Sequence, residues 1–323
     1  MRIKLSNPRG FCAGVRMAVD IVDQLLDVIG DHEKLYVYHE IVHNRHVVKR
    51  LRDRGALFVE TIKEIPSNAI VVFSAHGVSP EVKKQAADKH LKCIDATCPL
   101  VTKVHAEAIR YAKRGWQILL IGHKNHQEVV GTQGEAPNEI QIVETVNDIS
   151  NLNIDDPSKL VYLTQTTLST DDAEIIISAL RSAFPKIHAP PTDDICYATT
   201  ERQNAVREDA EGVDLVLVVG SKNSSNSVRL TEISESVGTT AHLIDDVSEL
   251  KQEWFENINS VLITAGASAP EHLVLELIKH LSTTYDGVLE GNSEFDEGMT
   301  FSMPPSLNTF LQSKTITIEG KQV

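Results

Sequence analysis

The chain has 323 residues, of which 41% are hydrophobic and 24% charged, and its formal net charge is −14. This length and composition are typical of a folded protein with two or three domains. The negative charge argues against nucleic-acid binding, which depends on clustered lysines and arginines. No run of about 18 apolar residues could span a membrane, and the first residues lack a secretory signal, so we expect a cytoplasmic protein.

Short β-branched segments alternate with amphipathic helical segments, which indicates an α/β protein with parallel sheets. The first helical segment has apolar residues at helical spacing from Val15 to Ile29, and Gly30 is a candidate C-cap. Further helix starts are predicted at Ser79, Ser169 and Pro270.

Six apolar strands are predicted after this helix, and each ends in polar side chains. The strand ends carry, in chain order, His43, His76, His126 with Glu128, Thr166, Ser224 to Asn226, and Ser268. In open α/β sheets, ligands bind beyond the carboxyl ends of the strands. The sequence therefore predicts a ligand site built from these ends.

Three cysteines divide the strand ends into pairs at similar spacing. The steps are 31 and 64 residues from Cys12 to His43 and His76, 28 and 68 from Cys98 to His126 and Thr166, and 28 and 72 from Cys196 to Ser224 and Ser268. This repetition predicts three similar α/β lobes, residues 1–97, 98–195 and 196–282. The tail, residues 283–323, is expected to pack back on the first lobe.

Each of these three cysteines precedes a predicted helix, whose N–H groups and dipole stabilise a thiolate. Three thiolates meeting at one centre could hold zinc with a fourth ligand or a [4Fe–4S] cluster with one open iron, and the spacing alone does not decide between them. Cys93 lacks a helix start, so we assign it a structural role.

The segment His39 to His43 matches the HExxH zinc-protease motif, which requires both histidines on one helical face. Here the motif continues the strand-like residues 35–38, and Asn44 resembles the N-cap of the next helix. We therefore do not predict a metalloprotease.

The three histidines and the serines form a donor-rich set that suits a compact oxyanion such as diphosphate. Glu128 would repel an anion, so it is better explained as a proton carrier, with Thr166 passing or orienting the proton. The sequence contains neither GxGxxG nor a P-loop. Electrons for a reduction would then come from a separate protein.

Seven segments, in order along the chain, resemble the IspH/LytB family of 4-hydroxy-3-methylbut-2-enyl diphosphate reductases. They are residues 7–15, 74–78, 95–101, 164–169, 193–199, 220–227 and 264–270. The family catalyses the last step of the non-mevalonate isoprenoid pathway, forming isopentenyl and dimethylallyl diphosphate. Two alternatives are a diphosphate-binding module whose cluster is structural or redox-sensing, and a zinc hydrolase.

The resemblance implies a three-lobed trefoil around a [4Fe–4S] cluster with one open iron, bound by Cys12, Cys98 and Cys196. It implies catalytic roles for Glu128, Thr166 and His126, with ferredoxin or flavodoxin as electron donor. The implied substrate-binding residues are His43, His76, His126, Thr166, Ser224, Ser225, Asn226 and Ser268.

Overall fold

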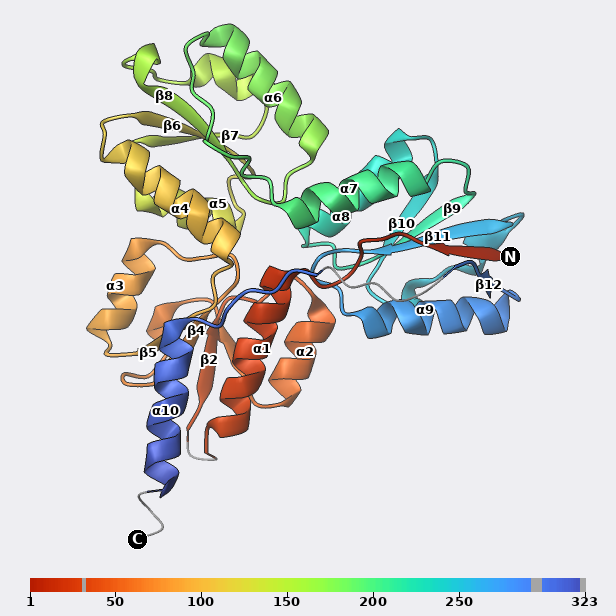
Figure 1. The fold of residues 1–323 in the computed structure, drawn as a ribbon, viewed down its shortest axis with the longest axis horizontal. Helices are drawn as coiled ribbons and strands as arrows, with labels where there is room; N and C mark the ends of the chain where they lie inside the picture. Colours follow the sequence, from red (N-terminus) through yellow and green to blue (C-terminus); the bar gives the residue numbers. More distant parts are fainter. Residues whose placement is uncertain (31–32, 292–297, 320–323) are drawn as a thin grey trace.

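The computed structural model describes residues 1–30, 33–291 and 298–319. They form three α/β lobes that meet at the centre of the molecule, each built on its own parallel sheet (Figure 1). The predicted fold class, α/β with three similar lobes, is confirmed. None of the helices in the described ranges has the length and apolarity needed to cross a membrane.

The first lobe contains a four-stranded sheet with helices on both faces. Its strands are β2 (Leu35–Tyr38), β3 (Leu57–Val59), β4 (Ile70–Phe73) and β5 (Lys92–Asp95), in the order β3-β2-β4-β5. Its helices are α1 (Ala13–Val28), α2 (Arg45–Asp53) and α3 (Pro80–Asp88). Alternate residues of the strands pack against α1 and α2 on one face and α3 on the other, as the two-residue period of a strand requires.

The second lobe has a three-stranded sheet. Its strands are β6 (Gln117–Ile121), β7 (Ile140–Val143) and β8 (Leu160–Thr164), in the order β7-β6-β8. Its helices are α4 (Pro99–Ala112), α5 (Gln127–Glu135) and α6 (Thr170–Ala183). Helices α4 and α5 cover one face, and α6 covers the other.

The third lobe has a five-stranded sheet in the order β10-β9-β11-β1-β12. Its strands are β1 (Arg2–Leu5), β9 (Leu215–Val219), β10 (Thr240–Ile244), β11 (Ser260–Ala265) and β12 (Val288–Leu289). Its helices are α7 (Tyr197–Asp209), α8 (Ser225–Ser236) and α9 (Glu271–Thr284). Helices α7 and α8 pack on one face and α9 on the other.

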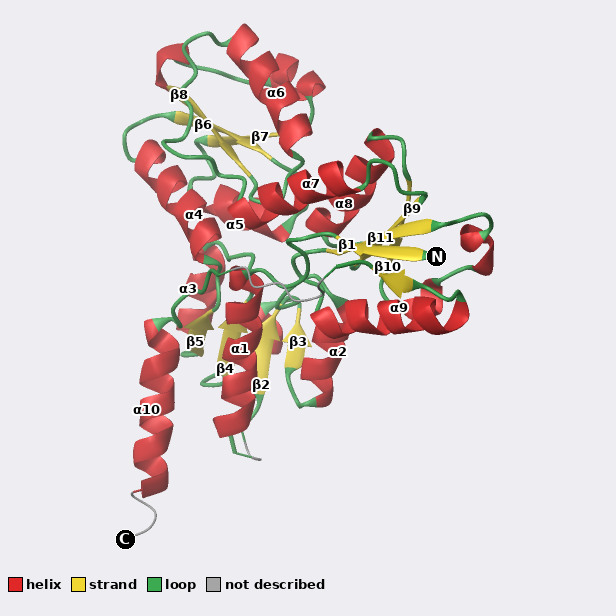
Figure 2. Ribbon diagram, turned by 45° about the vertical axis from the view of Figure 1, so that its right-hand side comes forward, coloured by secondary structure: helices red, strands yellow, loops and turns green. Residues whose placement is uncertain are grey.

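The two chain ends differ from the expected lobe boundaries. Strand β1 pairs with β11 and β12, so residues 2–5 lie in the third sheet rather than in the first lobe, and β12 also belongs to this sheet. The last described helix, α10 (Pro305–Glu319), brings Leu307 and Phe310 into the core of the first lobe. The chain thus links the third lobe to the first at both ends (Figure 2).

The strands with polar ends are neighbours within each sheet. Strand β2 pairs with β4, β6 with β8, and β9 with β11, and all three pairs are parallel. Because parallel neighbours end at the same edge, the two polar ends of each lobe lie side by side. This pairing is the feature of the fold that assembles the site.

The predicted helix starts are confirmed at Ser79, Ser169 and Pro270, which are the N-caps of α3, α6 and α9. The predicted cap at Gly30 is wrong. Helix α1 ends at Val28 with Ile29 as its C-cap, and Gly30 lacks the positive φ of a glycine cap.

Candidate active site

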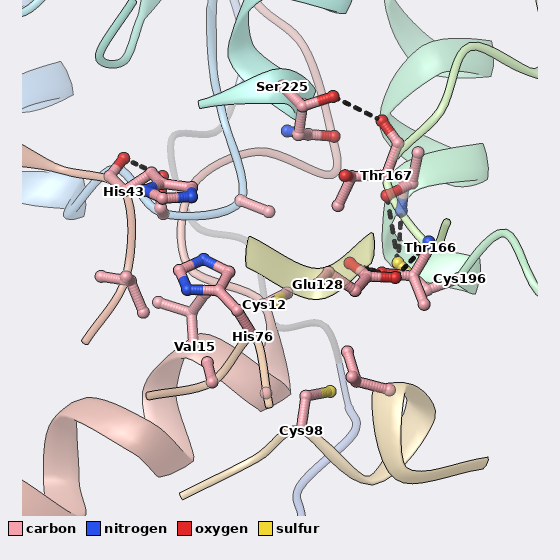
Figure 3. A pocket seen from close by; sticks show the side chains of 18 of the residues that line it. Cys12, Val15, His43, His76, Cys98, Glu128, Thr166, Thr167, Cys196 and Ser225 are labelled. Carbon is pink, nitrogen blue, oxygen red and sulfur yellow. Dashed lines mark hydrogen bonds between the residues drawn. The ribbon is translucent and has the colours of Figure 1, made fainter. Parts of the chain in front are cut away.

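One pocket lies where the three lobes meet, and all of the predicted site residues line it (Figure 3). These residues are Cys12, His43, His76, Cys98, His126, Glu128, Thr166, Cys196, Ser224, Ser225, Asn226 and Ser268. The predicted strand ends from all three sheets therefore come together at a single place.

Each of the three cysteines is the N-cap of a helix: Cys12 of α1, Cys98 of α4 and Cys196 of α7. Close packing brings the helix starts together. A Cβ atom at Gly14 would lie 2.6 Å from Sγ of Cys98, so this approach of α1 to Cys98 requires glycine. Figure 3 shows the side chains of all three cysteines among those that line the pocket.

The helix N–H groups lower the pKa of Cys98 and Cys196, but burial outweighs them. Burial, with a smaller contribution from the neighbouring cysteines, raises the pKa of Cys98 to about 12 against the N–H groups of α4. Burial likewise raises the pKa of Cys196 to about 11. Thiolates in this pocket therefore need a positive charge beyond that of the helix dipoles.

Three histidines form one wall of the pocket. The ring of His43 stacks on that of His76 with centroids 4.0 Å apart, and His126 stands edge-on to them at 5.5 and 5.9 Å. Burial and the neighbouring imidazoles hold the pKa of His76 well below its usual value and that of His126 at about 3. An anion bound at this wall would stabilise the protonated form of these imidazole rings.

Hydroxyl and amide groups of the third lobe continue this wall. Ser225 donates to the carbonyl of Thr167, and Ser268 donates to the carbonyl of His43 at 2.8 Å. Within the described ranges, neither the nitrogen nor the oxygen of the buried Asn226 amide has a hydrogen-bond partner. Since buried amides are normally paired, this amide is a candidate ligand contact.

Glu128 and Thr166, both in the second lobe, are hydrogen-bonded to each other. The two carboxylate oxygens accept hydrogen bonds from the backbone N–H of Thr166 at 2.6 Å and from its hydroxyl at 2.9 Å. His126 caps α5 by accepting from the N–H of Glu128. Burial raises the pKa of Glu128 to about 7 against these hydrogen bonds, so the carboxyl can exchange a proton near neutral pH.

The HExxH segment is not helical, as predicted. Asn44 is the N-cap of α2, and its side chain accepts from the N–H groups of His46 and Val47. His39 has a φ of 59° and pairs with Glu60 outside the pocket, whereas His43 lines it. Cys93 lies in β5, outside the pocket.

Sequence reasoning missed three side chains that support the site. The Thr199 hydroxyl lies 3.0 Å from Sγ of Cys196, and the backbone N–H of Thr199 donates to the same sulfur. Glu40 contacts His43, and the buried Asp194 accepts from the N–H of Thr164. Only Thr199 had a local signal, since a side chain at an N-cap contacts the residue three positions later.

The site and fold define a three-lobed α/β protein in which three thiols and a wall of imidazole, hydroxyl and amide groups line one pocket. The sequence model of the LytB protein family matches residues 3–282, and the chain belongs to this family.

Relatives agree with this assignment over nearly the whole chain. The chain is 51% identical to 4-hydroxy-3-methylbut-2-enyl diphosphate reductase of Rhodopirellula baltica, over 96% of this chain and 97% of the relative. It is 52% identical to the enzyme of the same name from Pseudomonas aeruginosa, over 95% and 98%.

A solved structure is also similar. The E-1-hydroxy-2-methyl-but-2-enyl-4-diphosphate reductase of Plasmodium falciparum is 39% identical and superposes with a TM-score of 0.91. The superposition covers 97% of this chain and 99% of that one. At this identity and coverage, the likeness extends through all three lobes.

Proposed function

We propose that this chain is an oxidoreductase that removes the hydroxyl group of 4-hydroxy-3-methylbut-2-enyl diphosphate. The products are isopentenyl and dimethylallyl diphosphate, and the reaction is the last step of the non-mevalonate isoprenoid pathway. Family membership and the names of the relatives support this proposal. The observation that carries it is the meeting of three thiols, an anion-accepting wall and a buried acid in one pocket.

Cys12, Cys98 and Cys196 would hold a [4Fe–4S] cluster. In the described part of the chain, no three histidine, cysteine or acidic residues are grouped closely enough to hold a single metal ion. The three thiols nevertheless line one pocket, and the raised pKa values of Cys98 and Cys196 mean that thiolates there need a positive centre. A cluster spaces its thiolates more widely than one zinc ion does, and with three protein ligands it would transfer electrons and provide an open Lewis-acidic iron.

The diphosphate would bind at the wall of imidazole, hydroxyl and amide groups. Its proposed contacts are His43, His76, His126, Ser224, Ser225, Asn226 and Ser268. These groups suit an anion in a chain of net charge −14, because they donate hydrogen bonds without a cluster of lysines and arginines. The Asn226 amide, which has no hydrogen-bond partner in the described part of the chain, gives the wall donor and acceptor capacity that a ligand can use.

Glu128 would be the general acid, with the Thr166 hydroxyl orienting the substrate oxygen and relaying the proton to it. The C–O bond breaks as this proton arrives, so the hydroxyl leaves as water. His126 would position Glu128 through its hydrogen bond at the start of α5. Two electrons and a second proton complete the reduction, and we propose the substrate's own diphosphate as the source of that proton.

The electrons would come from an external protein of the ferredoxin or flavodoxin type in the cytoplasm. The absence of a GxGxxG motif and of a P-loop in the sequence supports a separate donor over a bound nucleotide.

Anaerobic purification followed by viologen-driven turnover tests the proposal. The expected result is brown protein that contains iron and sulfide and converts the hydroxylated diphosphate to the two products. Colourless protein containing zinc, or iron–sulfur protein that binds the diphosphate without consuming it, would contradict the proposed activity.

A further inference from the structure

The acidic residue of the HExxH segment has a place in the structure that the zinc-protease motif does not explain. Glu40 follows strand β2, and its Oε2 lies 3.2 Å from Nδ1 of His43. The same oxygen accepts a hydrogen bond of 2.8 Å from the side chain of Asn223, in the third lobe. One carboxylate therefore contacts both His43 of the first lobe and the loop of the third lobe that leads to Ser224.

The ionised state of Glu40 determines which nitrogen of His43 carries a proton. The hydrogen bond from His43 is the largest influence on Glu40 and lowers its pKa, so Glu40 is a carboxylate at neutral pH. A carboxylate only accepts hydrogen bonds, and Nδ1 of His43 must then carry a proton. Nε2 is left for the pocket, and no hydrogen bond to it occurs among the described residues.

The backbone of His43 is also hydrogen-bonded to the third lobe. Ser268 donates to the carbonyl of His43 at 2.8 Å, and its hydroxyl lies 3.4 Å from that of Ser224. Asn223 directly precedes Ser224, the N-cap of α8. The Glu40–Asn223 contact thus closes a ring of hydrogen bonds around the place where the first and third lobes meet.

We propose that Glu40 is a positioning residue for diphosphate binding, which holds His43 as a proton donor toward the ligand and joins it to the Ser224–Asn226 loop. The inference rests on the proposed function, because it takes diphosphate as the ligand of this wall. When diphosphate binds, His43 lies protonated between two anionic partners, Glu40 at Nδ1 and the ligand at Nε2. The carboxylate supports this charge, as carboxylate partners do for other functional imidazoles.

The direction in which Glu40→Gln changes the affinity for diphosphate distinguishes this role from a purely electrostatic one. A negative charge near an anion site weakens anion binding by repulsion, so removal of the charge would tighten binding if Glu40 acted only through its field. If Glu40 acts through His43, the uncharged Glu40→Gln variant binds diphosphate less tightly. The loss of one charge-assisted hydrogen bond, reduced by the 34% exposure of the Glu40 side chain, corresponds to about a tenfold change in Kd.

The chain offers a matched control in the other half of the HExxH segment. His39 and Glu60 form the same kind of pair, 2.6 Å apart, but neither lines the pocket, and the Glu60 side chain is 74% exposed. Glu60→Gln should therefore leave diphosphate binding unchanged.

The test is titration of the anaerobic holoenzyme with inorganic diphosphate, together with steady-state kinetics. For Glu40→Gln we expect about a tenfold rise in the Kd for diphosphate and in KM, with kcat within about twofold of the wild type. Glu40→Asp, which keeps the charge, should recover part of the affinity. In a His43→Ala background, Glu40→Gln should have no further effect.

Two results would overturn the role of Glu40: equal or tighter diphosphate binding by Glu40→Gln, or the same loss of affinity with and without His43. Failure of the wild-type holoenzyme itself to bind diphosphate is a different result, which would contradict the proposed function as well. Thermal melting of each variant checks that it is folded, and Glu40→Asp serves as the second variant if Glu40→Gln does not fold.

Discussion

The side of the pocket with the proposed acid, Glu128, and the proposed anion-accepting wall differ in how completely their polar groups are hydrogen-bonded. Both oxygens of the Glu128 carboxylate accept hydrogen bonds from Thr166, a residue of the same lobe. The anion-accepting wall combines residues of all three lobes, and the amide of Asn226 has no hydrogen-bond partner in the described ranges. The Glu128–Thr166 pair is thus formed within one lobe, whereas the wall depends on the assembly of three lobes, and we propose that a ligand completes it.

The largest effect should come from the acid. Glu128→Gln keeps the size of the side chain but removes the proton, and kcat should fall by about 100-fold or more, as for a lost general acid. KM should change little, because the anion-accepting wall is untouched. Steady-state kinetics measure both constants, and the iron–sulfur absorption spectrum should be unchanged.

Glu144→Gln is the control for this substitution, because Glu144 lies in the same lobe, pairs with His123 and does not line the pocket. Near-normal kcat in Glu128→Gln would show that the acid lies elsewhere.

A substitution in the anion-accepting wall should have a smaller effect, on KM rather than on kcat. Asn226→Ala removes a buried amide that has no hydrogen-bond partner among the described residues, so the cost should be in ligand binding rather than in folding. We expect KM to rise about tenfold or more while kcat changes by less than about threefold. The exposed Asn147→Ala serves as the control. A fall in kcat without a rise in KM would erase the distinction between the two sides.

The smallest effect should be a shift in pH dependence. In the proposed mechanism the protonated form of Glu128 is the active acid, so kcat should be at its maximum below the Glu128 pKa of about 7 and should fall as the pH rises through that value. Thr166→Val removes a hydroxyl that stabilises the carboxylate, which raises the pKa and moves the descending limb to higher pH.

Because the acid itself is still present in Thr166→Val, kcat at its acidic plateau should fall less than in Glu128→Gln. A pH–kcat profile of the two proteins measures the shift. A limb that stays in place or moves to lower pH in Thr166→Val would argue against Glu128 as the group that titrates.

The sequence predicted the site better than it predicted the chain ends. The strand ends could be found because polar residues follow β-branched runs, and sheet geometry then requires neighbouring ends to meet. Strands β1 and β12 have only four and two residues, and nothing in such short segments indicates that they join a sheet formed mainly by residues 215–265. Their positions depend on long-range pairing.

Long-range packing also explains what was missed within the site. Glu40 and Asn223 are 183 positions apart, and no local pattern predicts their contact. The position of Cys98 at a helix start was readable, but its pKa depends on burial among side chains of other segments, which outweighs the helix. Local signals therefore gave the residues, and tertiary packing determined their protonation.

The meeting of Cys12, Cys98 and Cys196 around one inorganic centre is tested most directly by metal analysis. Iron and acid-labile sulfide should be measured in the anaerobic wild type, in Cys98→Ser and in Cys93→Ser, since Cys93 is a free cysteine outside the pocket. We predict about four iron and four sulfide per chain in the wild type and Cys93→Ser, and a marked loss of both in Cys98→Ser. Equal iron in all three proteins, or zinc in place of iron, would contradict a cluster held by these thiols.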